Sequence, residues 1–315
     1  MADKRSGTCC ARRAWMSACK EGEIESMRGI MIQGTASDVG KSLIVTALCR
    51  LLLQKGFQPA PFKSQNVTNY AYITEDGKEL GKAQVLQAEA CRLEPLPEIN
   101  PILLKPAKPG RSEVVWLGER LEVISGMKYR EQYYSKAVET IQHSLAKLRE
   151  LSDFLVIEGA GSPVEMNLKK REVVNMKVAE LADVPVILVA DVQRGGLFAS
   201  VVGTLDLLEP QERGRVKGII INKFHGDPLL FDEGKQWLEA RTGIPVLAVL
   251  PYLADHQLEE EDALSPPTKK LQLEEQEMMN SKEETYNQLA AHLQKHLDWE
   301  KFISIVSEAE KESIG

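Results

Sequence analysis

Short apolar runs recur along the first 250 positions, and each is nearly continuous in valine, isoleucine and leucine. They occupy residues 28–33, 154–159, 184–191, 216–224 and 244–251. Such runs are typical of strands that are covered on both faces. Between them, apolar residues recur at helical spacing over residues 42–56, 133–151, 174–182, 197–208 and 229–242. This alternation predicts an α/β fold with a doubly wound, mostly parallel sheet that binds ligands at the carboxyl ends of its strands.

The pattern changes after residue 250. Residues 256–284 are acidic and interrupted by proline, which predicts a linker. Residues 285–315 carry apolar side chains at helical spacing, which predicts one amphipathic helix or two short ones docked on the body or on a partner. Their polar face is not basic, which argues against a helix on a membrane surface. The main domain is therefore expected at residues 28–255, preceded by a disordered extension over residues 1–27.

Charge and composition narrow the class of partner. The chain has 39 Lys and Arg against 46 Asp and Glu, a net charge of −7, and the excess acid lies after residue 256. The nearly neutral body predicts no nucleic-acid partner. No apolar run approaches the roughly 18 residues of a membrane span, which predicts no membrane partner. The five cysteines form no C-x-x-C pair and follow no secretory signal, so we expect free thiols in a reducing cytoplasm.

The segment "GTASDVGKS" over residues 34–42 resembles a phosphate-binding loop with one extra residue between its two glycines. Such a loop needs converging backbone N–H groups, a helix N-terminus and a lysine that neutralises phosphate charge. Gly34 and Gly40 provide the turn, Lys41 the cation, and the Ser42 hydroxyl a ligand for Mg²⁺. Since a strand precedes the loop and a helix follows it, the sequence predicts a nucleotide site.

Other chemical groups end neighbouring strands. Glu158 in "LVIEGAGSP" is a carboxylate that suits Mg²⁺. Lys63 in "APFKSQN" is placed to stabilise charge on a transferring phosphoryl group. Asn222 in "IINKF" begins a segment similar to the guanine-recognition motif N-K-x-D. The acid of that motif is missing, because position 225 is His225. Adenine is therefore the expected base, with Asn222 as its amide contact.

A glycine loop of this length, a lysine after the second strand and the segment E-G-A-G form the set that dethiobiotin synthetase carries. Longer strings are similar to the cobyric acid synthase family, namely "MIQGTASDVGKSLIVTALCR", "GKAQVLQAEA", "INPILLKP", "IEGAGSPVEMNL", "ADVQRGGLFASVVGT" and "INKFHGD". The resemblance implies a dethiobiotin-synthetase-like P-loop enzyme that uses ATP and Mg²⁺. Its reaction would be amidation of corrin side-chain carboxylates through an acyl phosphate, from adenosylcobyrinic acid a,c-diamide towards cobyric acid, in cobalamin biosynthesis.

The resemblance also implies roles for individual residues. Lys63 falls on the catalytic lysine and acts with Lys41, while Asn222 falls on the adenine contact. Glu89 is the candidate for a third metal ligand beside Ser42 and Glu158. The expected nucleotide-binding residues are Gly34, Thr35, Asp38, Val39, Gly40, Lys41, Ser42, Leu43 and Asn222. The residues expected to face the corrin are Gln65, Asn66 and Arg194.

Two departures from the family pattern matter. Gln193 stands where the family pattern has an acid, which argues against a metal or acid role at that position. No cysteine follows Cys91, so the nucleophile of the family's glutaminase domain is missing from this chain. The segment "YNQLAAHLQKHLDWEKFISIV" nevertheless resembles the extreme C-terminus of full-length members. We therefore expect ammonia as the nitrogen source, supplied by a separate glutaminase, and a homodimer stays a candidate assembly.

Two other functions stay open on the sequence alone. One is a dethiobiotin-synthetase-like carboxylase or ligase, although the chain is longer than that family needs. The other is a non-catalytic P-loop protein that regulates a partner by binding it. An intact set of Lys41, Ser42, Lys63 and Glu158 weighs against the second alternative.

Overall fold

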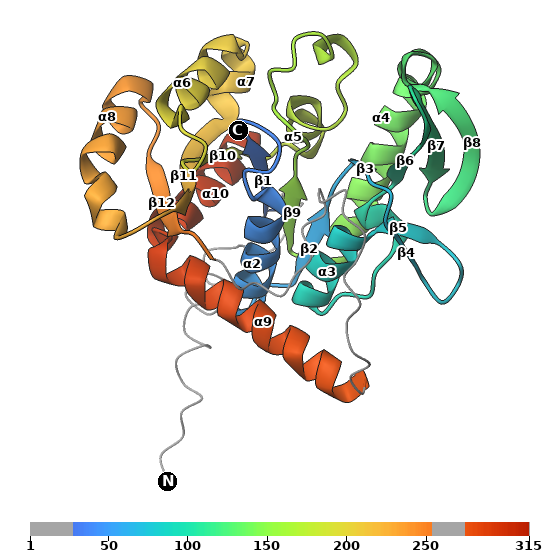
Figure 1. Ribbon diagram of the computed structural model, residues 1–315, viewed down its shortest axis with the longest axis horizontal. Helices are drawn as coiled ribbons and strands as arrows, with labels where there is room; N and C mark the ends of the chain where they lie inside the picture. Colours follow the sequence, from blue (N-terminus) through green and yellow to red (C-terminus); the bar gives the residue numbers. More distant parts are fainter. Residues whose placement is uncertain (1–27, 254–274, 315) are drawn as a thin grey trace.

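A computed structural model describes residues 28–253 and 275–314, which form one α/β body (Figure 1). Its centre is a sheet of six strands that are all parallel, in the order β12-β11-β10-β1-β9-β2. The strands are β1 (Arg28–Gly34), β2 (Pro59–Phe62), β9 (Phe154–Glu158), β10 (Val186–Asp191), β11 (Val216–Phe224) and β12 (Val246–Pro251). The predicted doubly wound, mostly parallel sheet is therefore confirmed.

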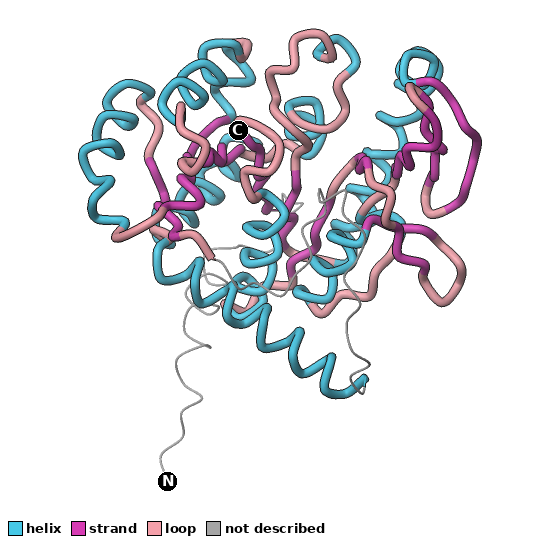
Figure 2. The backbone as a smooth tube through the Cα atoms, in the orientation of Figure 1, coloured by secondary structure: helices cyan, strands magenta, loops and turns pink. Residues whose placement is uncertain are grey.

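Helices cover both faces of this sheet (Figure 2). The helices are α2 (Lys41–Gln54), α3 (Lys82–Cys91), α4 (Gly126–Leu151), α5 (Met176–Ala182), α6 (Leu197–Leu207), α7 (Pro210–Arg215), α8 (Asp232–Thr242), α9 (Glu275–His296) and α10 (Trp299–Ile314). Alternate residues of one strand face opposite layers: Met31 packs with α4, α5 and α6, whereas Ile30 and Ile32 pack with α2, α9 and α10. Short 3-10 turns are η1 (Pro97–Ile99), η2 (Lys169–Arg171) and η3 (Pro228–Phe231). Both layers are apolar, which is why each central strand is a nearly continuous apolar run in the sequence.

An insertion between β2 and α4 was not predicted from the apolar pattern. It contains a second sheet in the order β3-β6-β7-β8 and a two-stranded ribbon of β4 and β5. Its strands are β3 (Gln65–Val67), β4 (Ala71–Ile73), β5 (Glu79–Gly81), β6 (Ile102–Lys108), β7 (Arg111–Trp116) and β8 (Glu119–Ser125). Three of these strands have only three residues, too few for a period-2 pattern to stand out. The insertion places Gln65 and Asn66 beside the carboxyl end of β2.

The C-terminal helices are part of the body. α9 lies across α2, and α10 packs against β1 and β12 (Figure 1). α9 begins at Glu275, so the boundary of the expected linker at residue 284 is wrong. The segment from residue 275 is rich in Glu, Gln, Met and Lys, which favour helices although their polarity resembles a linker. The expected extension over residues 1–27 and the remaining linker, residues 256–274, lie outside the described residues.

Across residues 28–253 and 275–314, no helix combines the length and apolar character needed to cross a membrane.

Candidate nucleotide-binding site

The glycine loop joins β1 to α2 and lies at the carboxyl edge of the sheet. Gly40, the N-cap of α2, has a φ of 93°, in the left-handed region that favours glycine. A Cβ at Gly40 would lie 2.2 Å from the Asn222 side-chain nitrogen. Because of both constraints only glycine fits, and the loop is held close to the end of β11. Asn222 Nδ2 donates to the Val39 carbonyl at 2.8 Å, and Lys223 Nζ donates to the Asp38 carbonyl at 2.6 Å.

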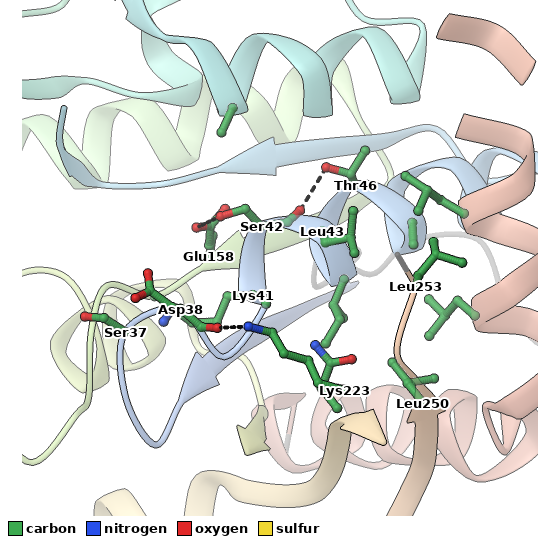
Figure 3. A pocket seen from close by; sticks show the side chains of 18 of the residues that line it. Ser37, Asp38, Lys41, Ser42, Leu43, Thr46, Glu158, Lys223, Leu250 and Leu253 are labelled. Carbon is green, nitrogen blue, oxygen red and sulfur yellow. Dashed lines mark hydrogen bonds between the residues drawn. The ribbon is translucent and has the colours of Figure 1, made fainter. Parts of the chain in front are cut away.

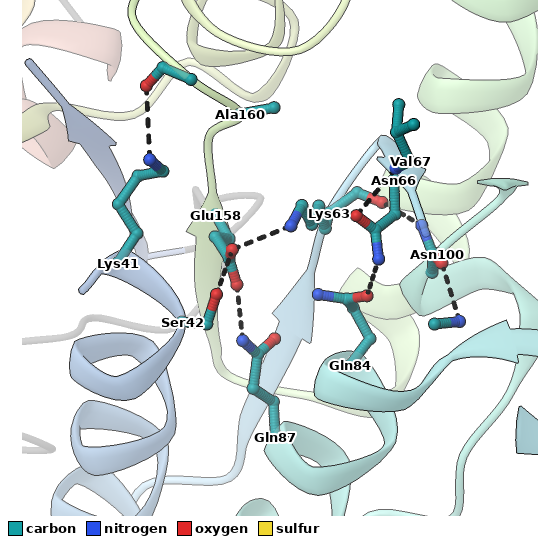
Figure 4. A network of polar contacts seen from close by, with 12 residues as sticks. Lys41, Ser42, Lys63, Asn66, Val67, Gln84, Gln87, Asn100, Glu158 and Ala160 are labelled. Atoms are coloured by element: carbon teal, nitrogen blue, oxygen red, sulfur yellow. Dashed lines mark hydrogen bonds and ion pairs between the residues drawn. The ribbon is translucent and has the colours of Figure 1, made fainter. Parts of the chain in front are cut away.

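Lys41 lies under the loop at the start of α2. Its Nζ donates to the carbonyl of Ala36 at 3.0 Å and to that of Gly161 at 3.3 Å. The ammonium group therefore bridges the glycine loop and the loop after β9 (Figure 4). A cation at the N-terminus of a helix, among backbone N–H groups, is the arrangement that binds phosphate oxygens.

Glu158 is the centre of a buried polar network at the end of β9 (Figure 4). Its Oε1 accepts from Ser42 Oγ at 2.7 Å and from Lys63 Nζ at 3.0 Å, and its Oε2 accepts from Gln87 Nε2 at 2.6 Å. Burial alone would raise the pKa of Glu158. The positive charge of Lys63 and the hydrogen bonds from Gln87, Ser42 and Lys63 outweigh burial, so its pKa is lowered and the group is a carboxylate.

The oxygen atoms of this network suit a magnesium ion. Mg²⁺ is bound through one or two carboxylates, a hydroxyl and phosphate oxygens rather than by an all-protein cage. In residues 28–253 and 275–314, no three His, Cys, Asp or Glu side chains gather in a way that could hold a metal by themselves. The side-chain oxygen Oε1 of Gln87 is buried and has no hydrogen-bond partner among residues 28–253 and 275–314, which leaves an acceptor beside Glu158. Ser42 and Glu158 therefore fit a metal that is shared with a phosphate.

The third expected metal ligand, Glu89, is not brought to this network. Its carboxylate accepts from Lys282 Nζ at 3.0 Å and from the Tyr286 hydroxyl at 2.7 Å, both on α9. Glu89 follows Gln87 by two residues on α3, so the two side chains leave the helix on different sides. The acid was predicted because carboxylates bind metals, and Gln87 was not predicted. The spacing of Gln84 and Gln87 puts them on one helix face, but it does not say which face of α3 turns toward Glu158.

The residues expected to face the corrin lie in three different environments. Asn66 is buried at the edge of the pocket, where its Nδ2 donates to Gln84 Oε1 at 3.1 Å. Gln65 Oε1 accepts from the Tyr129 hydroxyl at 2.7 Å. Arg194 is exposed and donates to Asp38 Oδ2 of the glycine loop at 3.1 Å. Of the three, Asn66 is the one that lines the pocket.

Gln193, the residue that stands in place of an acid, has an exposed side chain. Its backbone N–H donates to Asp191 Oδ1 at 2.6 Å, which closes the turn after β10. The structure therefore places a turn, and no acidic group, at position 193.

One pocket of about 350 Å³ joins the glycine loop to the carboxyl ends of β11 and β12 (Figure 3). Of the expected nucleotide-binding residues, the pocket is lined by Asp38, Gly40, Lys41, Ser42, Leu43 and Asn222. Gly34, Thr35 and Val39 do not line it. Thr35 instead extends the strand ladder, because its N–H donates to the Val189 carbonyl at 2.9 Å, and Val39 is buried in the core.

The two ends of this pocket differ in chemistry (Figure 3). We call the part around Ser42, Lys63 and Glu158 the phosphate end. The part around Leu250–Leu253 at the end of β12 is the base end, and leucines predominate there. Additional lining residues at the base end come from α9, namely Leu289, His292 and Leu293. A charged end joined to an apolar end matches the two halves of a nucleotide.

The fold and this site define a P-loop nucleotide-binding protein. The profile of the CobQ/CobB/MinD/ParA nucleotide binding domain matches residues 30–264, and the chain belongs to this family.

Curated relatives carry a more specific name. The chain is 51% identical over 236 residues to the cobyric acid synthase of Geobacillus kaustophilus (strain HTA426), covering 75% of this chain and 47% of the relative. It is 54% identical over 236 residues to that of Desulforamulus reducens, covering 75% of this chain and 46% of the relative. The chain thus spans about half the length of the curated relatives it matches.

Among solved structures, the MinC:MinD cell division protein complex of Aquifex aeolicus aligns with a TM-score of 0.40 at 13% identity. This alignment covers 72% of this chain and 82% of that one. A likeness of this extent does not bear on the reaction.

Proposed function

We propose that this chain is an ATP- and Mg²⁺-dependent C–N ligase that amidates corrin side-chain carboxylates in cobalamin biosynthesis. The observation that carries the proposal is the phosphate end of the pocket, where Lys41, Lys63 and the Ser42–Glu158 pair surround one space. A site that only held a nucleotide would need the glycine loop and Lys41. The buried lysine opposite the loop is the additional group that phosphoryl transfer requires.

The proposed reaction has two steps. A carboxylate oxygen of the substrate attacks the γ-phosphorus of ATP, an O–P bond forms, and the bond to the β-phosphate oxygen breaks to release ADP. The nitrogen lone pair of ammonia then attacks the acyl carbon, phosphate leaves, and a proton is lost to solvent. Both steps build up negative charge on phosphate oxygens, so fixed cations lower their barriers.

Different residues of this chain serve different parts of the proposed reaction. The backbone of the loop and Lys41 bind the β- and γ-phosphates, while Lys63 approaches the transferring group from the other side of Glu158. Ser42 and Glu158 would hold Mg²⁺, which supplies Lewis-acid charge to the phosphate oxygens when bound. Asn66 and Lys63 both line the pocket, and we assign Asn66 to the carboxylate or amide of the corrin side chain (Figure 4). Gln65 and Arg194 support that edge and the glycine loop, respectively, through Tyr129 and Asp38.

We assign free ammonia as the nitrogen source for these 315 residues. Releasing ammonia from glutamine needs a thiolate nucleophile with a histidine partner. Cys49 and Cys91 are both buried between α2 and α3. Burial, followed by the contact with Cys49, raises the pKa of the Cys91 thiol, which disfavours the reactive thiolate. Neither cysteine of the described residues therefore suits glutamine hydrolysis.

The test is phosphate release and corrin amidation by the purified chain with the a,c-diamide substrate, ATP and Mg²⁺. We expect turnover with ammonium chloride at alkaline pH and none with glutamine alone. Adding a separate glutaminase should restore the reaction with glutamine. Lys41→Ala removes the bonds from Nζ to the Ala36 and Gly161 carbonyls, and it should abolish turnover while far-ultraviolet circular dichroism stays unchanged. Glutamine-supported amidation that resists thiol alkylation would overturn the assignment, and phosphate release that does not depend on Lys41 would overturn the ligase proposal.

A further inference from the structure

We propose that α9, near the C-terminal end of the chain, forms the base-binding wall of the nucleotide pocket, with Leu289, His292 and Leu293 against the base. This inference rests on the proposed ATP site and deepens it, because it assigns base recognition to a helix outside the strands and loops of the nucleotide-binding fold. The three residues lie about 250 positions after the glycine loop, yet they line the same pocket.

The chemistry of the wall fits a purine. Leu289 and Leu293 are four residues apart, so they lie on one face of α9, and His292 lies between them in the helical pattern. Leu250 and Leu253 from the end of β12 line the same part of the pocket. A flat, largely apolar ring is stabilised by burial between such side chains, whereas phosphates and ribose are not.

His292 adds a polar atom to this apolar wall. Its side chain is half-buried, and burial, followed by the nearby His296, lowers its pKa, although a hydrogen bond to the backbone of Pro251 acts in the opposite direction. A lowered pKa keeps the imidazole neutral at pH 7, and a neutral imidazole has one donor and one acceptor nitrogen. It can therefore hold Pro251 at the end of β12 and accept a hydrogen bond from a purine edge.

An ion pair between buried Arg50 and partly exposed Glu283 links α9 to α2. Arg50 of α2 is 2% exposed, and its two terminal nitrogens donate to the Glu283 carboxylate at 3.0 and 2.7 Å. The Arg50 guanidinium also lies over the Tyr286 ring, at 5.3 Å from its centroid. The Tyr286 hydroxyl and Lys282 bind Glu89 of α3. Since α2 begins at Lys41, the wall and the phosphate site are attached to the same rigid helix.

The test compares two probes, Mg²⁺·ATP and Mg²⁺·tripolyphosphate, by isothermal titration calorimetry on the full chain. Tripolyphosphate has the charge of the phosphates and no base. His292→Ala and Leu293→Ala should each weaken ATP binding by about tenfold, which corresponds to the loss of one good apolar or hydrogen-bonded contact. Both variants should bind tripolyphosphate as the parent chain does. Gln294→Ala, an exposed position on the same helix, is the matched control and should leave both dissociation constants unchanged.

The outcomes separate this inference from the proposed function. If the parent chain binds ATP and Lys41→Ala weakens both probes, but His292→Ala and Leu293→Ala bind ATP normally, the ATP site stands and the wall does not. If Leu293→Ala weakens tripolyphosphate as well, while His292→Ala changes neither probe, α9 supports the fold and does not contact the base. If the parent chain binds neither ATP nor tripolyphosphate, the proposed function itself fails, and the inference fails with it.

Discussion

The two ends of the pocket are built in opposite ways. The phosphate end consists of charged and polar groups from the glycine loop and from the ends of β2 and β9, and each is fixed by hydrogen bonds shorter than 3.5 Å. The base end consists mainly of leucines from the end of β12 and from α9, and the α9 residues reach it because α9 packs back onto α2. This difference shows that the polar groups of the pocket come from strand ends and the loops beside them, whereas its apolar wall depends on packing between distant parts of the chain.

The largest effect is expected from a substitution at the phosphate end. Lys63→Gln keeps a hydrogen-bond donor beside Glu158 but removes the positive charge that is fixed 3.0 Å from its Oε1. We expect turnover to fall by roughly 10²- to 10³-fold, as when one preorganised charge-stabilising group is lost. The dissociation constant for ATP should change far less, since the proposed contact strengthens as the phosphoryl group transfers.

The measurement is steady-state phosphate release together with calorimetric ATP binding. Lys177→Gln is the matched control, because this lysine pairs with Glu180 on the surface of α5 and does not line the pocket. A pure loss of ATP affinity at Lys63→Gln, with turnover unchanged at saturation, would assign Lys63 to ground-state binding and not to transfer.

A smaller effect is expected at Gln87, which contacts Glu158 but does not line the pocket itself. Its Nε2 holds Glu158 Oε2 at 2.6 Å, so it orients the carboxylate that would bind Mg²⁺. Gln87→Ala should raise the Mg²⁺ concentration needed for half-maximal turnover by about tenfold, in the range measured for residues that position a metal ligand. Gln87→Glu would place a second carboxylate beside Glu158, and it should raise the Glu158 pKa and lower activity near neutral pH.

The readout is a Mg²⁺ titration of phosphate release at saturating ATP. A merely structural role would lower the melting temperature without moving the Mg²⁺ dependence, and that result would remove Gln87 from the site. Glu89→Gln serves as the comparison two residues along α3. Its carboxylate binds α9, so its substitution should leave the Mg²⁺ dependence unchanged.

The same contrast explains how much could be predicted from the sequence. The glycine loop is continuous in sequence, and the ends of parallel strands meet at one edge of a sheet, so Lys41, Ser42, Lys63 and Glu158 could be placed together in advance. The choice between Gln87 and Glu89 could not be made. It depends on how α3 is rotated about its axis, and the helix is nearly uniform in hydrophobicity around its circumference, with buried residues on most sides.

The base end could not be predicted from the sequence, for a different reason. A leucine pattern predicts that a helix buries one face, but it does not say which surface covers that face. Here the answer lies in single long-range contacts, above all the Arg50–Glu283 ion pair, which joins residues 233 positions apart. Asn222 shows the intermediate case. Its position at a strand end was predicted, while its hydrogen bond to the Val39 carbonyl, which fixes the glycine loop, was not.

The smallest expected effect is a difference between the two ends in how stability depends on pH. The pKa of His292 is lowered from an ordinary value of 6.5, and that of Glu158 from 4.5. In both cases the unfolded state takes up the proton first as the pH falls, so each group's stabilisation is complete above the unfolded pKa and is lost as the pH falls through the folded one. The base end should therefore begin to lose stability just below pH 6.5, whereas the phosphate end should keep its own until the pH falls below 4.5.

The groups that influence His292 are His296, Lys295 and the backbone of Pro251, so a change confined to this window reports on that cluster. Differential scanning calorimetry between about pH 7.5 and pH 5 should show a small fall in melting temperature for the parent chain and a shallower one for His292→Ala. His143→Ala, on the exposed side of α4, should keep the parent slope. Equal slopes for the parent chain and His292→Ala would mean that the base end is no more sensitive to acid than the phosphate end.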